Sequence, residues 1–163
     1  MKYSVLIVED GHEYIDRAQQ FLSEDFEFTR AGHGAQALEL LRELAFDLVY
    51  LDMNFNRVES SELFGPRDEL AERFGGDFVQ AERFLESHQG VYVLAGLREA
   101  GHGMPVLMSY DFSVEPKRWA HLQGRYGPIA YLGDNEGPDE VRRALQSLVR
   151  GQVSGHPSDA QPL

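Results

Sequence analysis

The chain has 163 residues, of which 42% are hydrophobic and 26% are charged, a composition typical of one globular domain with its own core. Its formal net charge of -12 argues against nucleic acid and anionic membranes as partners, because both require a basic patch. The absence of cysteine excludes disulfide bonds, thiolate zinc sites and cysteine nucleophiles. The first apolar run, Val5 to Val8, is too short for a signal peptide or a membrane span, so we expect a cytoplasmic protein.

The first third of the chain alternates strand and helix patterns. Short apolar runs at 3–8 and 47–51 predict strands that are buried on both faces. Alternating phenylalanines predict another strand over 25–30. Apolar residues at helical spacing predict helices over 13–22 and 35–43.

The same alternation continues in the second half of the chain. Residues 91–100, 115–123 and 138–149 have helical spacing, and the last helix has Pro138 in its first turn. Short apolar strands are predicted over 105–108 and 129–132. Strands that alternate with helices predict an α/β fold, a doubly wound sheet of five parallel strands.

A long segment interrupts this pattern at about 55–89, where a loop of about 2–6 residues would be usual. Because 67–74 and 78–86 have helical patterns, we predict a partly helical insertion. We therefore expect one domain over 1–150, followed by a disordered tail over 151–163 that has almost no apolar content. The insertion has an apolar stripe that either packs back on the domain or forms a partner-binding face: Phe78, Ala81, Phe84 and Leu85.

Acidic residues follow several of the predicted strands. Glu9 and Asp10 follow the first strand, Asp52 follows the third and Asp134 follows the fifth. The carboxyl ends of parallel strands meet at one edge of a sheet. Carboxylates gathered there repel one another unless a proton or a hard cation such as Mg²⁺ or Mn²⁺ lies between them. An aspartate beside such a metal can attack a phosphoryl group; the alternative is that these acidic strand ends simply face solvent.

Six segments, taken in order and spacing, resemble the response-regulator receiver family, the CheY-like domains. They are VLIVED at 5–10, AGHGAQALELL at 31–41, DLVYLDMN at 47–54, GVYVLAGLREAG at 90–101, PVLMSYD at 105–111 and AYLGD at 130–134. The match runs from about residue 3 to 150 apart from the insertion. The resemblance implies a flavodoxin-like fold and a two-component signalling module that is not an enzyme.

The resemblance also implies roles for individual residues. Asp52 corresponds to the phosphoacceptor aspartate and a ligand of Mg²⁺, and Asp10 to the direct metal ligand. Glu9 corresponds to the acidic residue that binds the metal through water, and Asn54 would offer its backbone carbonyl to the metal. Tyr131 corresponds to the aromatic switch residue of the fifth strand, whose ring turns inward on activation.

Two positions depart from the family pattern. Asp134 stands where the family has a lysine that holds the phosphoryl oxygen, which changes the pocket by two charges. The family's switch threonine or serine falls on Tyr110 by direct counting, whereas Ser109 could serve if the strand end were offset. A basic residue of the insertion, Arg57 or Arg67, is a candidate replacement for the lysine.

Three functions follow from these features. The first is ordinary phosphorelay switching at Asp52, and the second is constitutive or partner-gated signalling, as in pseudo-receivers. The third is a phosphatase-like or other metal-dependent hydrolase that uses Asp10 and Asp52. Because no output domain follows the receiver-like segment, we expect protein partners: a histidine kinase, a downstream effector or a second copy of the chain.

Overall fold

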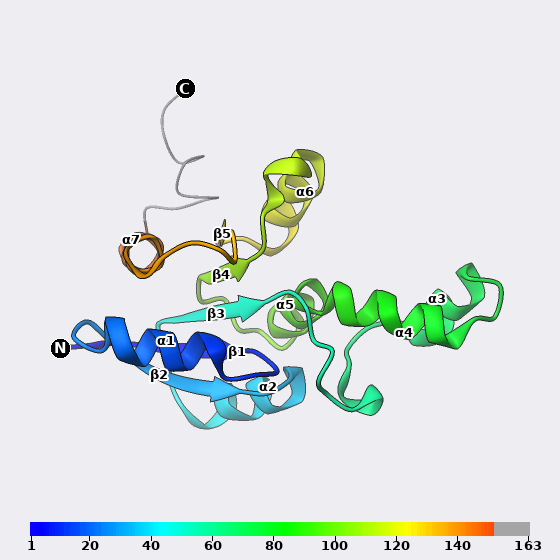
Figure 1. Ribbon diagram of the computed structural model, residues 1–163, viewed down its shortest axis with the longest axis horizontal. Helices are drawn as coiled ribbons and strands as arrows, with labels where there is room; N and C mark the ends of the chain where they lie inside the picture. Colours follow the sequence, from blue (N-terminus) through cyan, green and yellow to red (C-terminus); the bar gives the residue numbers. More distant parts are fainter. Residues whose placement is uncertain (152–163) are drawn as a thin grey trace.

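The computed structural model describes residues 1–151. Of the predicted tail over 151–163, residues 152–163 therefore lie outside the described residues. The strands form one parallel sheet in the order β2-β1-β3-β4-β5. Their bounds are Tyr3–Val8 for β1, Phe26–Ala31 for β2, Leu48–Asp52 for β3, Val106–Ser109 for β4 and Ile129–Leu132 for β5. The predicted doubly wound fold is confirmed (Figure 1).

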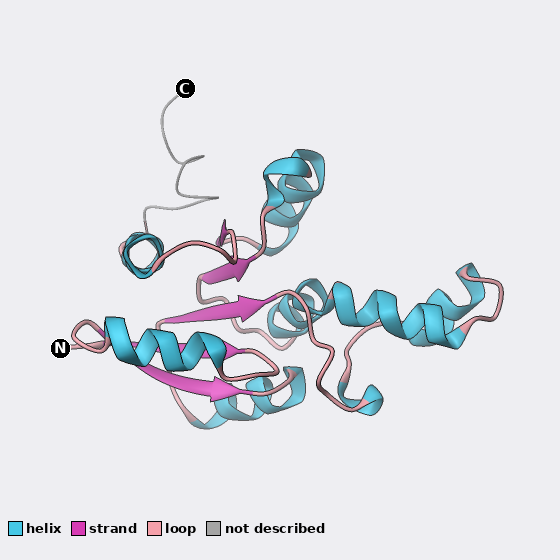
Figure 2. Ribbon diagram, viewed as in Figure 1, coloured by secondary structure: helices cyan, strands magenta, loops and turns pink. Residues whose placement is uncertain are grey.

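Helices cover both faces of the sheet (Figure 2). They are α1 (Glu13–Leu22), α2 (Gly34–Glu43), α3 (Arg67–Arg73), α4 (Phe78–Ser87), α5 (Gln89–Glu99), α6 (Pro116–Tyr126) and α7 (Pro138–Val149), with 3₁₀ turns η1 (Ser60–Glu62) and η2 (Phe112–Val114). Buried residues of α1 and α7 form one core, and those of α2, α5 and α6 form the other. No helix within residues 1–151 is both long and apolar enough to span a membrane.

The strands are continuous apolar runs because both of their faces are covered. In β1, Val5 and Ile7 point into the core under α1 and α7, and Leu6 and Val8 point into the opposite core. All four side chains are fully buried. This two-sided burial is the reason that the runs lack the alternation of a half-exposed strand.

The insertion extends from the body as α3 packed against α4 (Figure 1). The apolar stripe of the insertion was predicted either to pack back on the domain or to form a partner-binding face, and its residues differ in burial. Ala81 and Leu85 are fully buried in the core, whereas Phe78 at the start of α4 is 57% exposed. The carboxyl-terminal half of α4 therefore packs back on the domain, and its first turn remains at the surface.

A buried glutamine joins the insertion to the sheet-covering helix α5. Gln89 accepts a hydrogen bond from the Phe64 N–H at 2.7 Å and donates to the carbonyls of Phe64 and Leu85 at 3.0 and 3.1 Å. Its side chain satisfies backbone groups of the connection that would otherwise be unpaired in the interior. The helix α5 begins at Gln89, two residues before the predicted start at Val91.

The ring of Phe64 packs between two helices at positions that lack a side chain. A Cβ at Gly34 in α2 would lie 2.6 Å from Phe64 Cε2, and one at Gly96 in α5 would lie 2.9 Å from the same atom. Moving the ring away from one helix pushes it toward the other. These two glycines therefore provide the space that holds the insertion's connection against the body.

We expect Gly96→Ala to lower the free energy of unfolding by about 1–3 kcal/mol because the new methyl group overpacks the Phe64 ring. Alanine would otherwise stabilise a helix interior by about 1 kcal/mol relative to glycine. The matched control is Gly124→Ala in α6, where an added Cβ has nothing within 4 Å, and which should stabilise by about 0.5–1 kcal/mol. Urea denaturation measures both variants, and a similar gain for the two would contradict the packing of Phe64.

Candidate functional site

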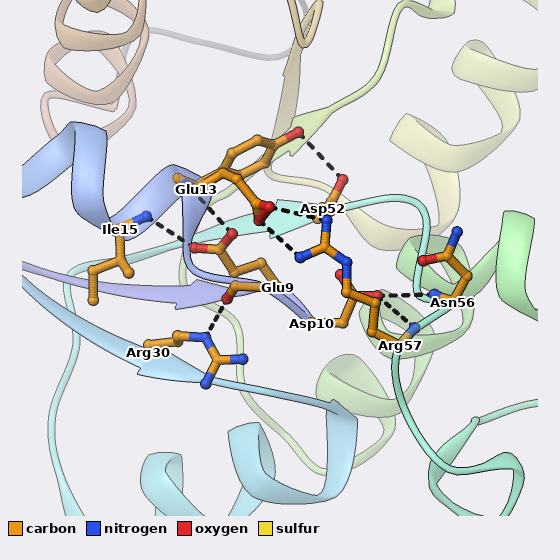
Figure 3. Close-up of polar contacts among 10 residues, drawn as sticks. Glu9, Asp10, Glu13, Ile15, Arg30, Asp52, Asn56 and Arg57 are labelled. Atoms are coloured by element: carbon orange, nitrogen blue, oxygen red, sulfur yellow. Dashed lines mark hydrogen bonds and ion pairs between the residues drawn. The ribbon is translucent and has the colours of Figure 1, made fainter.

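Acidic side chains from two strands lie together at the carboxyl edge of the sheet. Glu9 and Asp10 follow β1, and Asp52 ends the neighbouring strand β3 (Figure 3). On the other side of β3, the register pairs Asp52 with Ser109, the last residue of β4. We call these four residues the acidic pocket.

Asp10 is held by the backbone of the inserted segment. Its Oδ2 accepts hydrogen bonds from the N–H groups of Asn56 and Arg57, each at 2.9 Å. Arg57 also forms an ion pair with Glu13 at 2.9 Å, and both side chains are more than half exposed. A Cβ at Gly11 would overlap the ends of these two exposed side chains, which would have to move to make room for it. We call the contact of Asp10 with these two backbone N–H groups the Asp10 anchor.

Glu9 is a buried carboxylate that caps a helix. It is 2% exposed, and its two oxygens accept the N–H groups of Tyr14 at 3.1 Å and Ile15 at 2.8 Å. These are among the backbone donors that have no partner within the first turn of α1. Burial raises the pKa of Glu9, and the two backbone hydrogen bonds offset only part of this effect.

One carboxylate oxygen of Asp52 accepts hydrogen bonds from two protein donors. Its Oδ1 accepts the Met53 N–H at 2.8 Å and the Tyr14 hydroxyl at 3.3 Å. Burial and then the charge of Asp10 raise the pKa of Asp52 to about 6, although the Met53 and Tyr14 hydrogen bonds act in the opposite direction. The pocket therefore disfavours a further negative charge at this position.

Tyr14 closes one side of the pocket, a role that the sequence did not reveal. Its hydroxyl lies 2.8 Å from Ser109 Oγ and 3.3 Å from Asp52 Oδ1, and its ring stacks on Tyr50 with centroids 5.4 Å apart. Burial, together with the charges of Asp52 and Asp134, holds the pKa of Tyr14 far above its usual value, so the hydroxyl keeps its proton. In the sequence, Tyr14 is one apolar position among several in α1, and only its place five residues after Glu9 marks it.

The two candidate switch positions on β4 have different surroundings. Ser109 lies in the pocket beside Asp52. The hydroxyl of Tyr110 instead donates to Glu115 at 2.6 Å, outside the pocket. Strand β4 ends at Ser109, whereas direct counting placed the switch residue at Tyr110. Ser109 is therefore the β4 residue that pairs with Asp52.

Tyr131, the predicted aromatic switch, is buried and packed among other rings. It is 5% exposed, and its ring contacts those of Phe112 and Trp119 at 5.5 and 4.7 Å in edge-on geometry. Its role as a switch residue stays a prediction.

The remaining predicted residues lie around the rim. Asp134 is exposed on the loop after β5 and is close enough to affect Tyr14 electrostatically. Asn54 is exposed between β3 and the insertion. Arg67 donates to the carbonyl of Ser60 within the insertion, so of the two arginines considered as replacements for lysine only Arg57 contacts the pocket.

Several oxygens of the acidic pocket are already hydrogen-bonded to the protein. Among residues 1–151, no three side chains of the metal-binding types His, Cys, Asp and Glu are grouped to hold a metal ion. Glu9 turns both oxygens toward α1, and Asp10 uses Oδ2 for the backbone of the insertion. Magnesium binding stays a prediction, and it would require Asp10 to exchange its backbone donors for the ion.

Comparisons with known proteins support the fold. No family profile and no curated protein matches the sequence. Among solved structures, the receiver domain of the Francisella response regulator 1452 aligns over 92% of this chain and 98% of its own, with 15% identity and a TM-score of 0.62. A CheY-like receiver domain protein from Methanospirillum hungatei JF-1 aligns over 93% and 96%, with 15% identity and a TM-score of 0.60. An adenylate cyclase from Rhodopirellula baltica aligns over 92% and 89%, with 15% identity and a TM-score of 0.63. The chain thus has the fold of CheY-like receiver domains.

We expect Asp52→Asn to stabilise the folded protein at about pH 7 by about 1–2 kcal/mol, and to do so much less at about pH 4. The pKa of Asp52 is raised from 3.8 to about 6, so the folded state holds this proton more tightly than the unfolded chain. The resulting stability is fully present below the unfolded pKa and is lost as the pH rises through the folded pKa. Asparagine keeps an acceptor for Tyr14 but carries no charge. Urea denaturation of both proteins across this range measures the effect, and a difference independent of pH would contradict the raised pKa.

Proposed function

We propose that this protein is a pseudo-receiver: a cytoplasmic signalling module of receiver fold that acts by binding other proteins and does not depend on phosphorylation at Asp52. The Asp10 anchor is the observation that carries the proposal. The carboxylate that receivers would use for a metal is hydrogen-bonded to Asn56 and Arg57 of the chain's own insertion.

Electrostatics support the same proposal. A phosphoryl group on Asp52 would bring about 1.5–2 further negative charges beside Asp10 and Glu9, whose charges already raise the pKa of Asp52. Each unit interaction at about 4–6 Å costs on the order of 3–4 kcal/mol at an effective dielectric near 20. Arg57 is the nearby cation, but it is 58% exposed and paired with Glu13.

The hydrolase alternative has no specific observation in its favour. A metal-dependent hydrolase needs carboxylates with oxygens directed at an ion and an open position for a nucleophile. Here Glu9 caps α1, Asp10 holds the insertion, and Asp52 accepts the Tyr14 hydroxyl. We therefore propose protein partners rather than a substrate, either an upstream kinase with an effector or a second copy of the chain.

Beryllofluoride, which mimics a phosphoryl group on aspartate, provides the test. We expect amide NMR spectra of the wild type to change little on adding beryllofluoride and Mg²⁺. Asp134→Lys should give a larger, saturable change, because it replaces an anion at the pocket with the cation that the family uses. The double variant Asp134→Lys, Asp52→Asn is the matched control and should abolish that change.

Three outcomes would count against the proposal. A strong Mg²⁺-dependent response of the wild type that Asp52→Asn removes would make the protein an ordinary phosphorylation switch. A weaker response of Asp134→Lys than of the wild type would show that Asp134 does not occupy the lysine position. Multiple-turnover release of phosphate from a range of phosphorylated substrates would indicate an enzyme.

A further inference from the structure

We infer that His33 is a proton-operated clasp between α2 and the inserted segment, closed while its imidazole is neutral and opened when the ring takes up a proton from solvent. His33 is the N-cap residue of α2, and its side chain also reaches Glu62 of η1. We call the contacts of its ring with Gln36 and Glu62 the His33 clasp. The clasp adds a response to pH that the proposed function does not include, and it involves neither Asp10 nor Asp52.

The two ring nitrogens of His33 have opposite tasks. Nδ1 accepts the Gln36 N–H at 3.2 Å, and a backbone N–H only donates, so Nδ1 carries no proton. Nε2 lies 2.9 Å from Glu62 Oε2, and an ionised carboxylate only accepts, so Nε2 carries the proton. The two partners together therefore require the neutral Nε2–H tautomer of the ring.

A proton on Nδ1 is incompatible with this geometry. It would leave two N–H donors facing each other, with their nitrogens 3.2 Å apart and no acceptor between them. The ring of His33 must then turn away from Gln36. Because imidazole is one rigid ring, the turn that removes Nδ1 from Gln36 also moves Nε2 away from Glu62. The cap of α2 and the link to the insertion are thus lost together.

The charged groups around His33 act in opposite directions. Glu62 attracts a protonated ring, and Glu59 is the other carboxylate of the same capping box, but the side chain of Glu62 is 36% exposed, so solvent weakens the attraction. The first turn of α2 has no acidic residue, and the guanidinium of Arg30 lies beside Gly32. A lost N-cap and a cation at the positive end of a helix each typically cost as much as an exposed ion pair contributes. Protonation therefore favours the open clasp.

The clasp holds the inserted segment close to its start. The backbone N–H groups of Asn56 and Arg57 form the Asp10 anchor, and further along the same segment Glu62 is held by His33. An open clasp releases η1 from α2 while the Asp10 anchor stays in place. A fall in pH would thus loosen the segment whose backbone occupies the carboxylate of Asp10.

NMR of the full chain at about pH 8 and about pH 5.5 tests the clasp, because histidine changes charge between these values. At the higher pH, the ring ¹⁵N shifts of His33 should show an unprotonated Nδ1 and a protonated Nε2. On acidification the Gln36 amide signal should move upfield in step with the ring signals, because it loses its acceptor. The amides of Glu62 and Leu63 donate within η1, and their protection from hydrogen exchange, corrected for the intrinsic rate, should fall about fivefold or more.

Two variants separate the cap from the link. His33→Asn keeps a side-chain acceptor for the cap but does not titrate, so it should remove the pH response of both Gln36 and Leu63. Glu62→Ala keeps the cap and removes the link, so the Gln36 signal should still titrate while protection of Leu63 no longer depends on pH. The matched control is His121→Asn, which replaces an exposed histidine on α6 and should leave both responses as in the wild type.

The clasp is refuted if Nδ1 carries the proton at about pH 8, or if His33→Asn retains the pH response of the wild type. It is also refuted if the protection of Leu63 does not fall on acidification, because the insertion would then stay attached when the cap opens. A strong response of the wild type to beryllofluoride would contradict the proposed function and leave the clasp intact, since Asp52 takes no part in it.

Discussion

The hydrogen bonds from two backbone N–H groups to the carboxylate of Asp10 determine the character of this receiver fold. Asn56 and Arg57 belong to the inserted segment, whereas Asp10 follows the first strand of the sheet. Hydrogen bonds to an ionised acceptor are roughly twice as strong as neutral ones. They give the carboxylate two protein donors, and they tie the start of the insertion to the end of the first strand.

The insertion is consequently part of the domain's packing rather than an appendage. Gln89 pairs with the backbone of Phe64, and Gly90 lies directly against the backbone at Asp52 and Met53. The same helix that lines the apolar core therefore fixes the acidic residue at the end of β3.

The sequence predicted the sheet, its helices and the gathering of carboxylates at one edge, because two-sided burial leaves continuous apolar runs and parallel topology places strand ends together. It could not predict which donors each carboxylate would find. The bonds to Asp10 come from backbone N–H groups, whose direction depends on the course of the loop and not on residue type. Tyr14 fits the apolar pattern of α1 whether or not its hydroxyl enters the pocket, and the choice between Ser109 and Tyr110 depends on where β4 ends.

Amide proton NMR of Asn56 and Arg57 tests the central claim most directly, since their N–H groups report on the carboxylate of Asp10. The account predicts that both signals move upfield in Asp10→Asn, where a charged acceptor is lost, and that neither moves when millimolar Mg²⁺ is added to the wild type. Displacement of both signals by Mg²⁺, with saturation, would show that the ion takes Asp10 from the insertion and would contradict a pocket held by its own hydrogen bonds.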